Sequence, residues 1–315
     1  MKAVWHVAGI CCLLLFSAGA YSAEAKKDII YAGDAKCTRC HDEEDSPKIM
    51  TIGKTRHGVK ADGRVPTCVS CHGESELHAA YSGSDTPPPP DRAFGKKSTL
   101  SAEEKSAACS SCHQGGKHMN WSASAHAARD VACTSCHEIH APTDKVRDKR
   151  AQPQVCFTCH KQQRADIAKP SHHPIPEGKM TCSDCHNPHG SAGRFMLVKD
   201  TTNATCFTCH AEKRGPFLHN HQPVVEDCSN CHNPHGATAE SMLKARMPFL
   251  CQQCHGSTSH PGNVPGTRLD MPNAVSTNIG PGFAQARGCP NCHTDIHGSN
   301  NPSSAATSGP FRFFR

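Results

Sequence analysis

The sequence predicts a mostly irregular chain with a few short α-helices and almost no β structure, built as an elongated array. Only 36% of the 315 residues are hydrophobic and 5% are aromatic, which is little core material for a chain of this length. Its 24 glycines and 23 prolines interrupt the chain too often for long helices or strands. Something other than Leu, Ile and Val must therefore fill the interior.

Ten copies of the motif C-x-x-C-H supply such a filling. The two thiols of one copy can bind the two vinyl groups of a haem as thioethers, and the adjacent imidazole is then held against the iron. The cysteines are Cys37, Cys40, Cys68, Cys71, Cys109, Cys112, Cys133, Cys136, Cys156, Cys159, Cys182, Cys185, Cys206, Cys209, Cys228, Cys231, Cys251, Cys254, Cys289 and Cys292. The proximal histidines, which complete the motifs, are His41, His72, His113, His137, His160, His186, His210, His232, His255 and His293.

Two other uses of paired cysteines, zinc knuckles and a disulfide framework, fit the motifs less well. Neither needs a histidine after every second cysteine. Because about one residue in thirteen is His, ten such histidines in ten motifs are not chance. The sequence therefore predicts a multihaem cytochrome c with ten covalently bound haems c, in which the porphyrins form the core.

Further histidines are available as second axial ligands. Of the 24 histidines, His6 lies near the N-terminus and ten lie in motifs, which leaves thirteen. The chain repeats five times as a motif, a free histidine, a second motif and another free histidine, so that five two-haem units supply one distal histidine for each haem. The predicted distal ligands are His57, His78, His126, His140, His173, His189, His221, His235, His260 and His297.

Three histidines remain as spares: His118, His172 and His219. His126 and His221 each precede the next motif by seven residues, which favours them as ligands. The choices between His172 and His173, and between His219 and His221, stay open in the sequence. In the second, third and fourth units a free histidine follows the proximal one after only three residues, and we expect it to ligate a different haem.

The ends of the chain predict export and a loose tail. Lys2, an apolar stretch over 3–16 and small residues up to 25 have the layout of a signal peptide covering 1–23, with cleavage between 20 and 25. No later stretch is apolar enough to cross a bilayer. The haem domain is expected over 24–298, where the central units recur every 45 to 50 residues and so favour an elongated array. Residues 299–315 are expected to form a flexible C-terminal tail.

Local signals predict short elements around the motifs. Ser101 and Glu104 form a capping-box pattern that opens a helix towards Cys109. Residues 187–190 and 233–236 both read Asn-Pro-His-Gly, which is typical of a turn that presents its histidine. The four prolines at 87–90 indicate a stiff surface loop.

The net charge of +6 does not indicate a nucleic-acid partner. Ten haems add about −20 from their propionates and about +10 at ferric irons, so the oxidised holoprotein is acidic. The basic residues are then largely counter-charges to the propionates.

Three segments and the number of motifs resemble the MtrA/MtoA/PioA/DmsE family of decahaem cytochromes. The segments are CSDCHNPHG at 182–190, AEKRGP at 211–216 and CQQCH at 251–255. The resemblance implies an electron wire between the periplasm and the cell exterior, housed in an outer-membrane β-barrel porin and serving extracellular Fe(II) oxidation or metal-oxide reduction. It also implies periplasmic or inner-membrane cytochromes as partners and, at the outer surface, a further cytochrome.

Two other functions remain alternatives. A periplasmic electron shuttle or store would have the same motifs and no barrel partner. A multihaem reductase needs an iron with an open coordination site, often marked by a variant motif such as C-x-x-C-K. No such variant occurs here, and the histidines suffice for every iron. We therefore expect an electron carrier, not an enzyme.

Overall fold

The computed structural model describes residues 34–59, 63–255, 289–291 and 293–301. The predicted signal peptide, His260, Cys292 and most of the predicted tail lie outside these ranges. Within them, no helix combines the length and hydropathy that a membrane span requires.

Short helices are the regular elements of the described chain. The α-helices are α1 (Ala35–Thr38), α2 (Pro47–Met50), α3 (Cys68–His72), α4 (Glu76–Ala79), α5 (Ala102–Ser110), α6 (Gln152–Cys156), α7 (Lys161–Asp166), α8 (Thr202–Cys206), α9 (Gln222–Glu226) and α10 (Phe249–Gln252). The 3₁₀ helices are η1 (Thr51–Lys54), η2 (Arg56–Gly58), η3 (Gly116–His118), η4 (Trp121–Ala123), η5 (Ala127–Arg129), η6 (Cys133–Ser135), η7 (Lys145–Arg147), η8 (Cys182–Asp184), η9 (Arg194–Met196), η10 (Ala211–Lys213), η11 (Cys228–Asn230), η12 (Glu240–Met242) and η14 (Cys289–Asn291). In place of strands, the described residues contain isolated β-bridges. The predicted fold class is confirmed.

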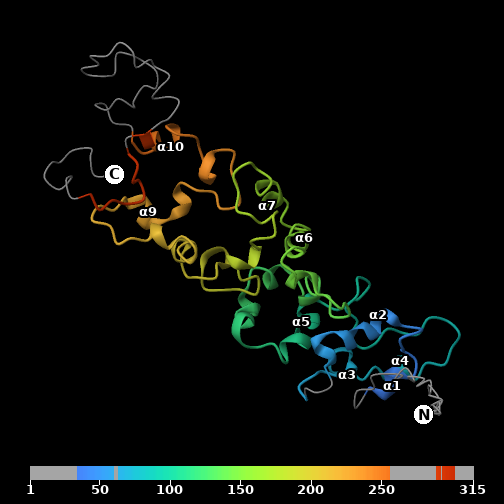
Figure 1. Cartoon of the computed structure of the whole chain (residues 1–315). Helices are drawn as coiled ribbons and strands as arrows, with labels where there is room; N and C mark the ends of the chain where they lie inside the picture. Colours follow the sequence, from blue (N-terminus) through green and yellow to red (C-terminus); the bar gives the residue numbers. More distant parts are fainter. Residues whose placement is uncertain (1–33, 60–62, 256–288, 292, 302–315) are drawn as a thin grey trace, which may run out of the picture.

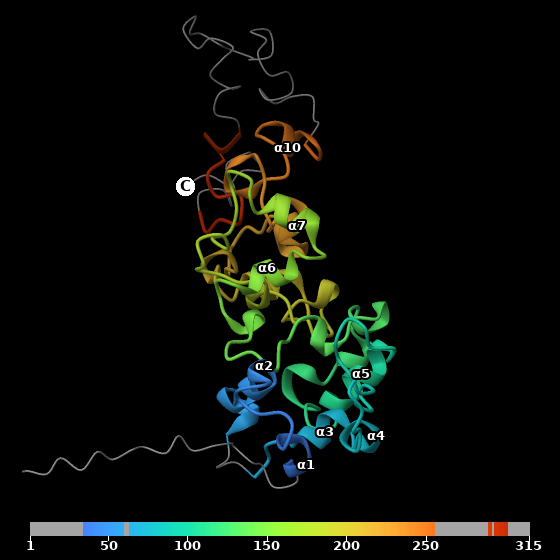
Figure 2. The ribbon, with the colours of Figure 1, turned by 90° about the vertical axis from the view of Figure 1, so that its right-hand side faces the viewer.

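The described chain is elongated and runs along its long axis in sequence order (Figures 1 and 2). Helices α1 to α4 lie at one end, α5 to α7 lie in the middle, and α9 and α10 lie at the other end. Units that are neighbours in the sequence are therefore neighbours in space.

Each described motif forms one helical turn. The amide of His137 donates to the carbonyl of Cys133 at 3.0 Å, and the equivalent bond in the third unit, from His160 to Cys156, also measures 3.0 Å. Positions i, i+3 and i+4 of such a turn share one face, so both cysteines and the histidine point the same way. The spacing of the motif is thus what allows all three side chains to reach one haem.

The local predictions hold where the structure describes them. Helix α5 begins with a capping box between Ser101 and Glu104 and ends one residue after Cys109. In the two Asn-Pro-His-Gly segments, the glycine amide donates to the asparagine carbonyl, at 2.9 Å in 187–190 and 3.1 Å in 233–236. Both segments are therefore turns.

The protein part of the core is small, as the composition predicts. Few large apolar side chains among the described residues are buried, and they are spread along the chain. The buried hydrophobic residues are Ala132, Phe157, Ile167, Ala237, Ala239 and Leu250. An interior this poor in aliphatic contacts leaves the haem sites to supply the main packing surface.

Candidate haem sites

Nine histidine pairs face each other across a gap that suits one iron. Each pair joins a proximal histidine to one predicted distal histidine, with ring centroids 6.0–6.3 Å apart. Two metal–imidazole bonds of about 2 Å, with about 1 Å from each Nε2 to its ring centroid, span such a gap. The pairs are His41 with His78, His57 with His113, His72 with His140, His126 with His160, His137 with His189, His173 with His210, His186 with His235, His221 with His255, and His232 with His297.

These pairs follow a rule that the sequence does not reveal. The first free histidine of a unit faces the first proximal histidine of the next unit, as His126 faces His160. The second free histidine faces the second proximal histidine of the preceding unit, as His189 faces His137. Each junction between neighbouring units is thus crossed in both directions. The first unit has no predecessor, and there His78 faces His41 of its own unit.

Main-chain carbonyls of the adjoining unit hold several of the crossing histidines. Nδ1 of His126 donates to the carbonyl of Pro188 at 2.8 Å, and Nδ1 of His173 donates to that of Pro234 at 2.7 Å. Pro188 directly precedes His189, and Pro234 directly precedes His235. These two histidines cross the same junctions in the other direction. A carbonyl acceptor on Nδ1 leaves Nε2 free to bind a metal and fixes the ring orientation.

Main-chain bridges reinforce two of the junctions between units. Ser171 and Ala237 exchange two backbone hydrogen bonds of 3.2 and 2.8 Å, and His219 and Ser299 exchange two of 2.9 Å. Ser171 lies two positions before His173, and Ala237 lies two positions after His235, which crosses the junction in the other direction. His219 and Ser299 have the same positions relative to His221 and His297. The neighbouring units are therefore clamped to each other at the distal ligands.

Burial favours the neutral form of several paired histidines, and only a neutral imidazole binds a metal. It is the largest cause that lowers their pKa, and for His189, where nearby His118 adds to it, the pKa falls to about 4. The other paired histidines with a pKa lowered mainly by burial are His57, His72, His221, His235 and His297.

Within each unit the two motifs meet at their first cysteines. The thiols of these cysteines are close enough to shift each other's pKa, so the two attachment points lie near each other. The contacts are Cys37 with Cys68, Cys109 with Cys133, Cys156 with Cys182, Cys206 with Cys228, and Cys251 with Cys289.

Between units, the second motif of one unit approaches the first motif of the next. Burial is the largest cause that raises the pKa of the second cysteine of these motifs, and a cysteine of the following motif raises it further. These neighbours are Cys71 with Cys112, Cys136 with Cys159, Cys185 with Cys206, and Cys231 with Cys254. Together the two kinds of contact link the ten attachment points into one unbranched row in sequence order.

A set of buried polar residues that sequence reasoning missed docks the two motifs of a unit. Each lies three residues before the first cysteine of the unit, and its side chain accepts a hydrogen bond from the amide of the first cysteine of the second motif. These bonds are Cys68 to Asp34 at 2.7 Å, Cys133 to Ser106 at 3.4 Å, and Cys228 to Asn203 at 2.7 Å. All three acceptors are buried. The shared position before the motif is the signal that could have identified them.

The three spare histidines lie close to histidines of the facing pairs. The ring of His118 lies 4.4 Å from His189 and 5.5 Å from His113. The main chain of His219 forms the bridge to Ser299 described above, at the position that Ser171 occupies in the preceding unit.

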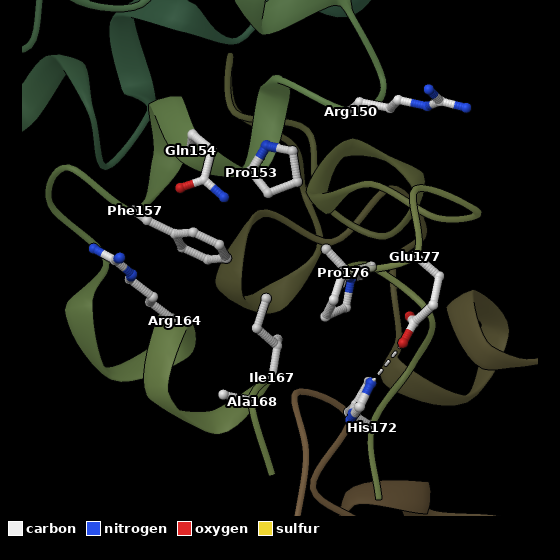
Figure 3. A pocket seen from close by; sticks show the side chains of 11 residues that line it. Arg150, Pro153, Gln154, Phe157, Arg164, Ile167, Ala168, His172, Pro176 and Glu177 are labelled. Atoms are coloured by element: carbon white, nitrogen blue, oxygen red, sulfur yellow. Dashed lines mark hydrogen bonds and ion pairs between the residues drawn. The ribbon is translucent and has the colours of Figure 1, made fainter. Parts of the chain in front are cut away.

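His172 lines a cavity of about 350 Å³, where its ring faces Glu177 (Figure 3). The cavity is lined by Phe157 of the third unit and by Ile167, among others. Nδ1 of His172 donates to the carbonyl of Lys169, and its Nε2 lies 3.3 Å from Oε1 of Glu177. These two acceptors raise the pKa of His172, which favours the protonated ring and not the neutral one that a metal needs.

Comparison with known proteins agrees with this geometry. A family model described as "Doubled CXXCH motif" matches residues 172–215 and 221–260, and one described as "Cytochrome c-type protein NrfB-like" matches residues 68–151. The chain is 46% identical over 275 residues to "Multiheme cytochrome MtrA" of Shewanella baltica (strain OS185), covering 86% of this chain and 80% of that protein. It belongs to the MtrA-like multihaem cytochromes.

A second relative is more distant. "Cytochrome c-type protein NrfB" of Haemophilus influenzae is 29% identical over 147 residues, covering 41% of this chain and 65% of that protein. As an MtrA-like cytochrome, the chain binds multiple c-type haems through its C-x-x-C-H motifs and is an electron-transfer protein, not an enzyme. The predicted family is confirmed.

Proposed function

We propose that each of the ten motifs binds one haem c, and that every iron carries two axial histidines. The nine facing pairs support this assignment for the described residues. His293 is the remaining proximal histidine, and His260, which lies outside the described residues, is its proposed partner. The five two-haem units are then joined by ligands that they exchange, and the two end units complete themselves.

The choice between adjacent histidines can be tested directly. We expect His173→Ala to convert one low-spin haem to high spin, because its ring lies 6.3 Å from that of His210. The neighbouring variant His172→Ala should keep all haems low-spin, since His172 faces Glu177. Absorption and electron paramagnetic resonance spectra of the purified holoproteins distinguish the two. A high-spin haem in His172→Ala alone would reverse the assignment.

We further propose that the haems form a wire that carries electrons between the periplasm and the cell exterior through an outer-membrane β-barrel. The observation that supports this most is the unbroken row of motif contacts along an elongated chain (Figure 1). Electron tunnelling weakens steeply with distance, so closely spaced haems in one row conduct along it. Export by the predicted signal peptide and exchange with periplasmic or inner-membrane cytochromes are parts of this proposal.

A barrel is needed on physical grounds. Irregular backbone cannot face lipid, because its unpaired amides and carbonyls would lack water. A wire across the outer membrane must nevertheless cross a hydrocarbon layer of roughly 25–30 Å. A wide β-barrel would supply the lipid-facing wall, and the cytochrome would occupy its lumen. Oxidation of external Fe(II) and reduction of external metal oxides could both use this route.

Reconstitution tests the conduit. The holoprotein and the barrel that copurifies with it are inserted into vesicles that contain a reduced dye, and a membrane-impermeant oxidant is added outside. We expect rapid dye oxidation with both proteins and none with the barrel alone. Release of the cytochrome by osmotic shock, with no barrel bound to it, would instead support a periplasmic shuttle.

A further inference from the structure

Four equivalent proximal histidines differ in what holds them. They are the histidines of the second motif in the first four units, and in each the Nδ1 atom donates a hydrogen bond. Three donate to main-chain carbonyls, namely His72 to Arg92 at 2.8 Å, His186 to Phe195 at 3.0 Å and His232 to Ser241 at 2.8 Å. His137 instead donates to the carboxylate oxygen Oδ2 of Asp144 at 2.6 Å.

The local structure around Asp144 turns its carboxylate towards the haem ligand. Asp144 is the N-cap residue of η7, where an aspartate side chain ordinarily accepts from an amide of the first turn. Here the side chain makes no capping hydrogen bond, and the main-chain carbonyl of Asp144 accepts from the amide of Arg147 at 2.9 Å. The carboxylate side chain is only 18% exposed, so water screens it little.

A carboxylate acceptor changes the electronic character of a ligand more than a carbonyl does. A hydrogen bond from imidazole to a carboxylate is charge-assisted and makes the imidazole a stronger electron donor to its metal. A stronger donor stabilises the ferric ion relative to the ferrous ion, which lowers the reduction potential of a haem. The effect depends on the negative charge and not on the shape of the side chain.

We propose that Asp144 is a positioning residue that lowers the reduction potential of the haem bound at Cys133 and Cys136. This inference rests on the proposed role of His137 as an axial ligand. It adds that the fourth haem of the row has a lower reduction potential than the second, sixth and eighth haems, which occupy the same position in their units. An electron moving along the row then meets an uphill step at the fourth haem, and this haem is the last of those four to be reduced.

The isosteric variant Asp144→Asn removes the charge and keeps an acceptor for the ring. In an equilibrium redox titration of the holoprotein, the area between the variant and wild-type curves measures the total shift, even when the signals of the haems overlap. We expect one haem to become about ten-fold easier to reduce, which is 59 mV for one electron. Asp144→Ser, which also has an uncharged acceptor, should shift in the same direction.

Asp148→Asn is the matched control. The carboxylate of Asp148 accepts from the amides of Arg150 and Ala151 and not from a haem ligand. The redox titration of Asp148→Asn should therefore coincide with that of the wild type. A coincident curve for Asp144→Asn, in protein with all haems low-spin, would overturn the inference. A new high-spin haem in Asp144→Asn would overturn it too, because the carboxylate would then be needed to hold the ring. None of these measurements involves a membrane or a barrel, so they stand apart from the conduit test.

Discussion

Replacing His189 with alanine should open the iron of the haem bound at Cys133 and Cys136, although His189 lies next to a different motif. Its ring faces His137 at 6.1 Å, whereas His186 of its own motif faces His235. The expected result is one high-spin haem that binds carbon monoxide when reduced, seen as a change in the absorption spectrum. His118→Ala is the control, because His118 touches His189 without facing a proximal histidine at the distance of the pairs.

Double variants locate the opened haem. If His189 and His137 share one iron, the variant that lacks both should still have a single perturbed haem. The variant that lacks His189 and His186 should have two, because those histidines serve different irons. Mass spectrometry of the denatured protein gives the number of haems retained. The opposite pattern, with one perturbed haem after loss of His186 and His189, would contradict the exchange of ligands between units.

Replacing Gly236 with alanine should release the junction between the third and fourth units. Gly236 has a φ of +143°, and a Cβ there would lie 2.2 Å from the carbonyl oxygen of Asp166. A strained backbone and an overpacked contact each cost about 1–3 kcal/mol, so a loss of roughly 2–6 kcal/mol in the free energy of unfolding is expected. Because Gly236 follows His235 directly, the strain should also loosen that ligand and produce a high-spin haem at Cys182 and Cys185.

Gly115→Ala is the matched control for this variant. A Cβ at Gly115 would have no atom within 4 Å, and its φ lies outside the left-handed range. Thermal unfolding followed by circular dichroism should give a lower midpoint for Gly236→Ala and an unchanged one for Gly115→Ala. Equal midpoints and equal spin states in the two variants would show that the junction tolerates a side chain.

The chemistry of the haem sites could be predicted from the sequence because it is local. Thioether attachment and proximal ligation need two cysteines and a histidine at positions i, i+3 and i+4, and a single helical turn brings them onto one face. The capping box that begins α5 is local for the same reason. The lack of aliphatic residues was equally visible in the composition, and it predicted a core built of cofactors.

The tertiary structure alone decided which histidine faces which. His137 and His189 are separated by two complete motifs, at 156–160 and 182–186. No spacing rule connects the two histidines, because the contact forms only when neighbouring units dock. Asp144 lies only seven residues after His137, and its carboxylate reaches the ring because the loop before η7 turns it inward. The sequence by itself thus determined where haems attach and how many histidines are available to them. The pairing of these histidines and their order in space depend on long-range packing, which a local pattern of residues does not specify.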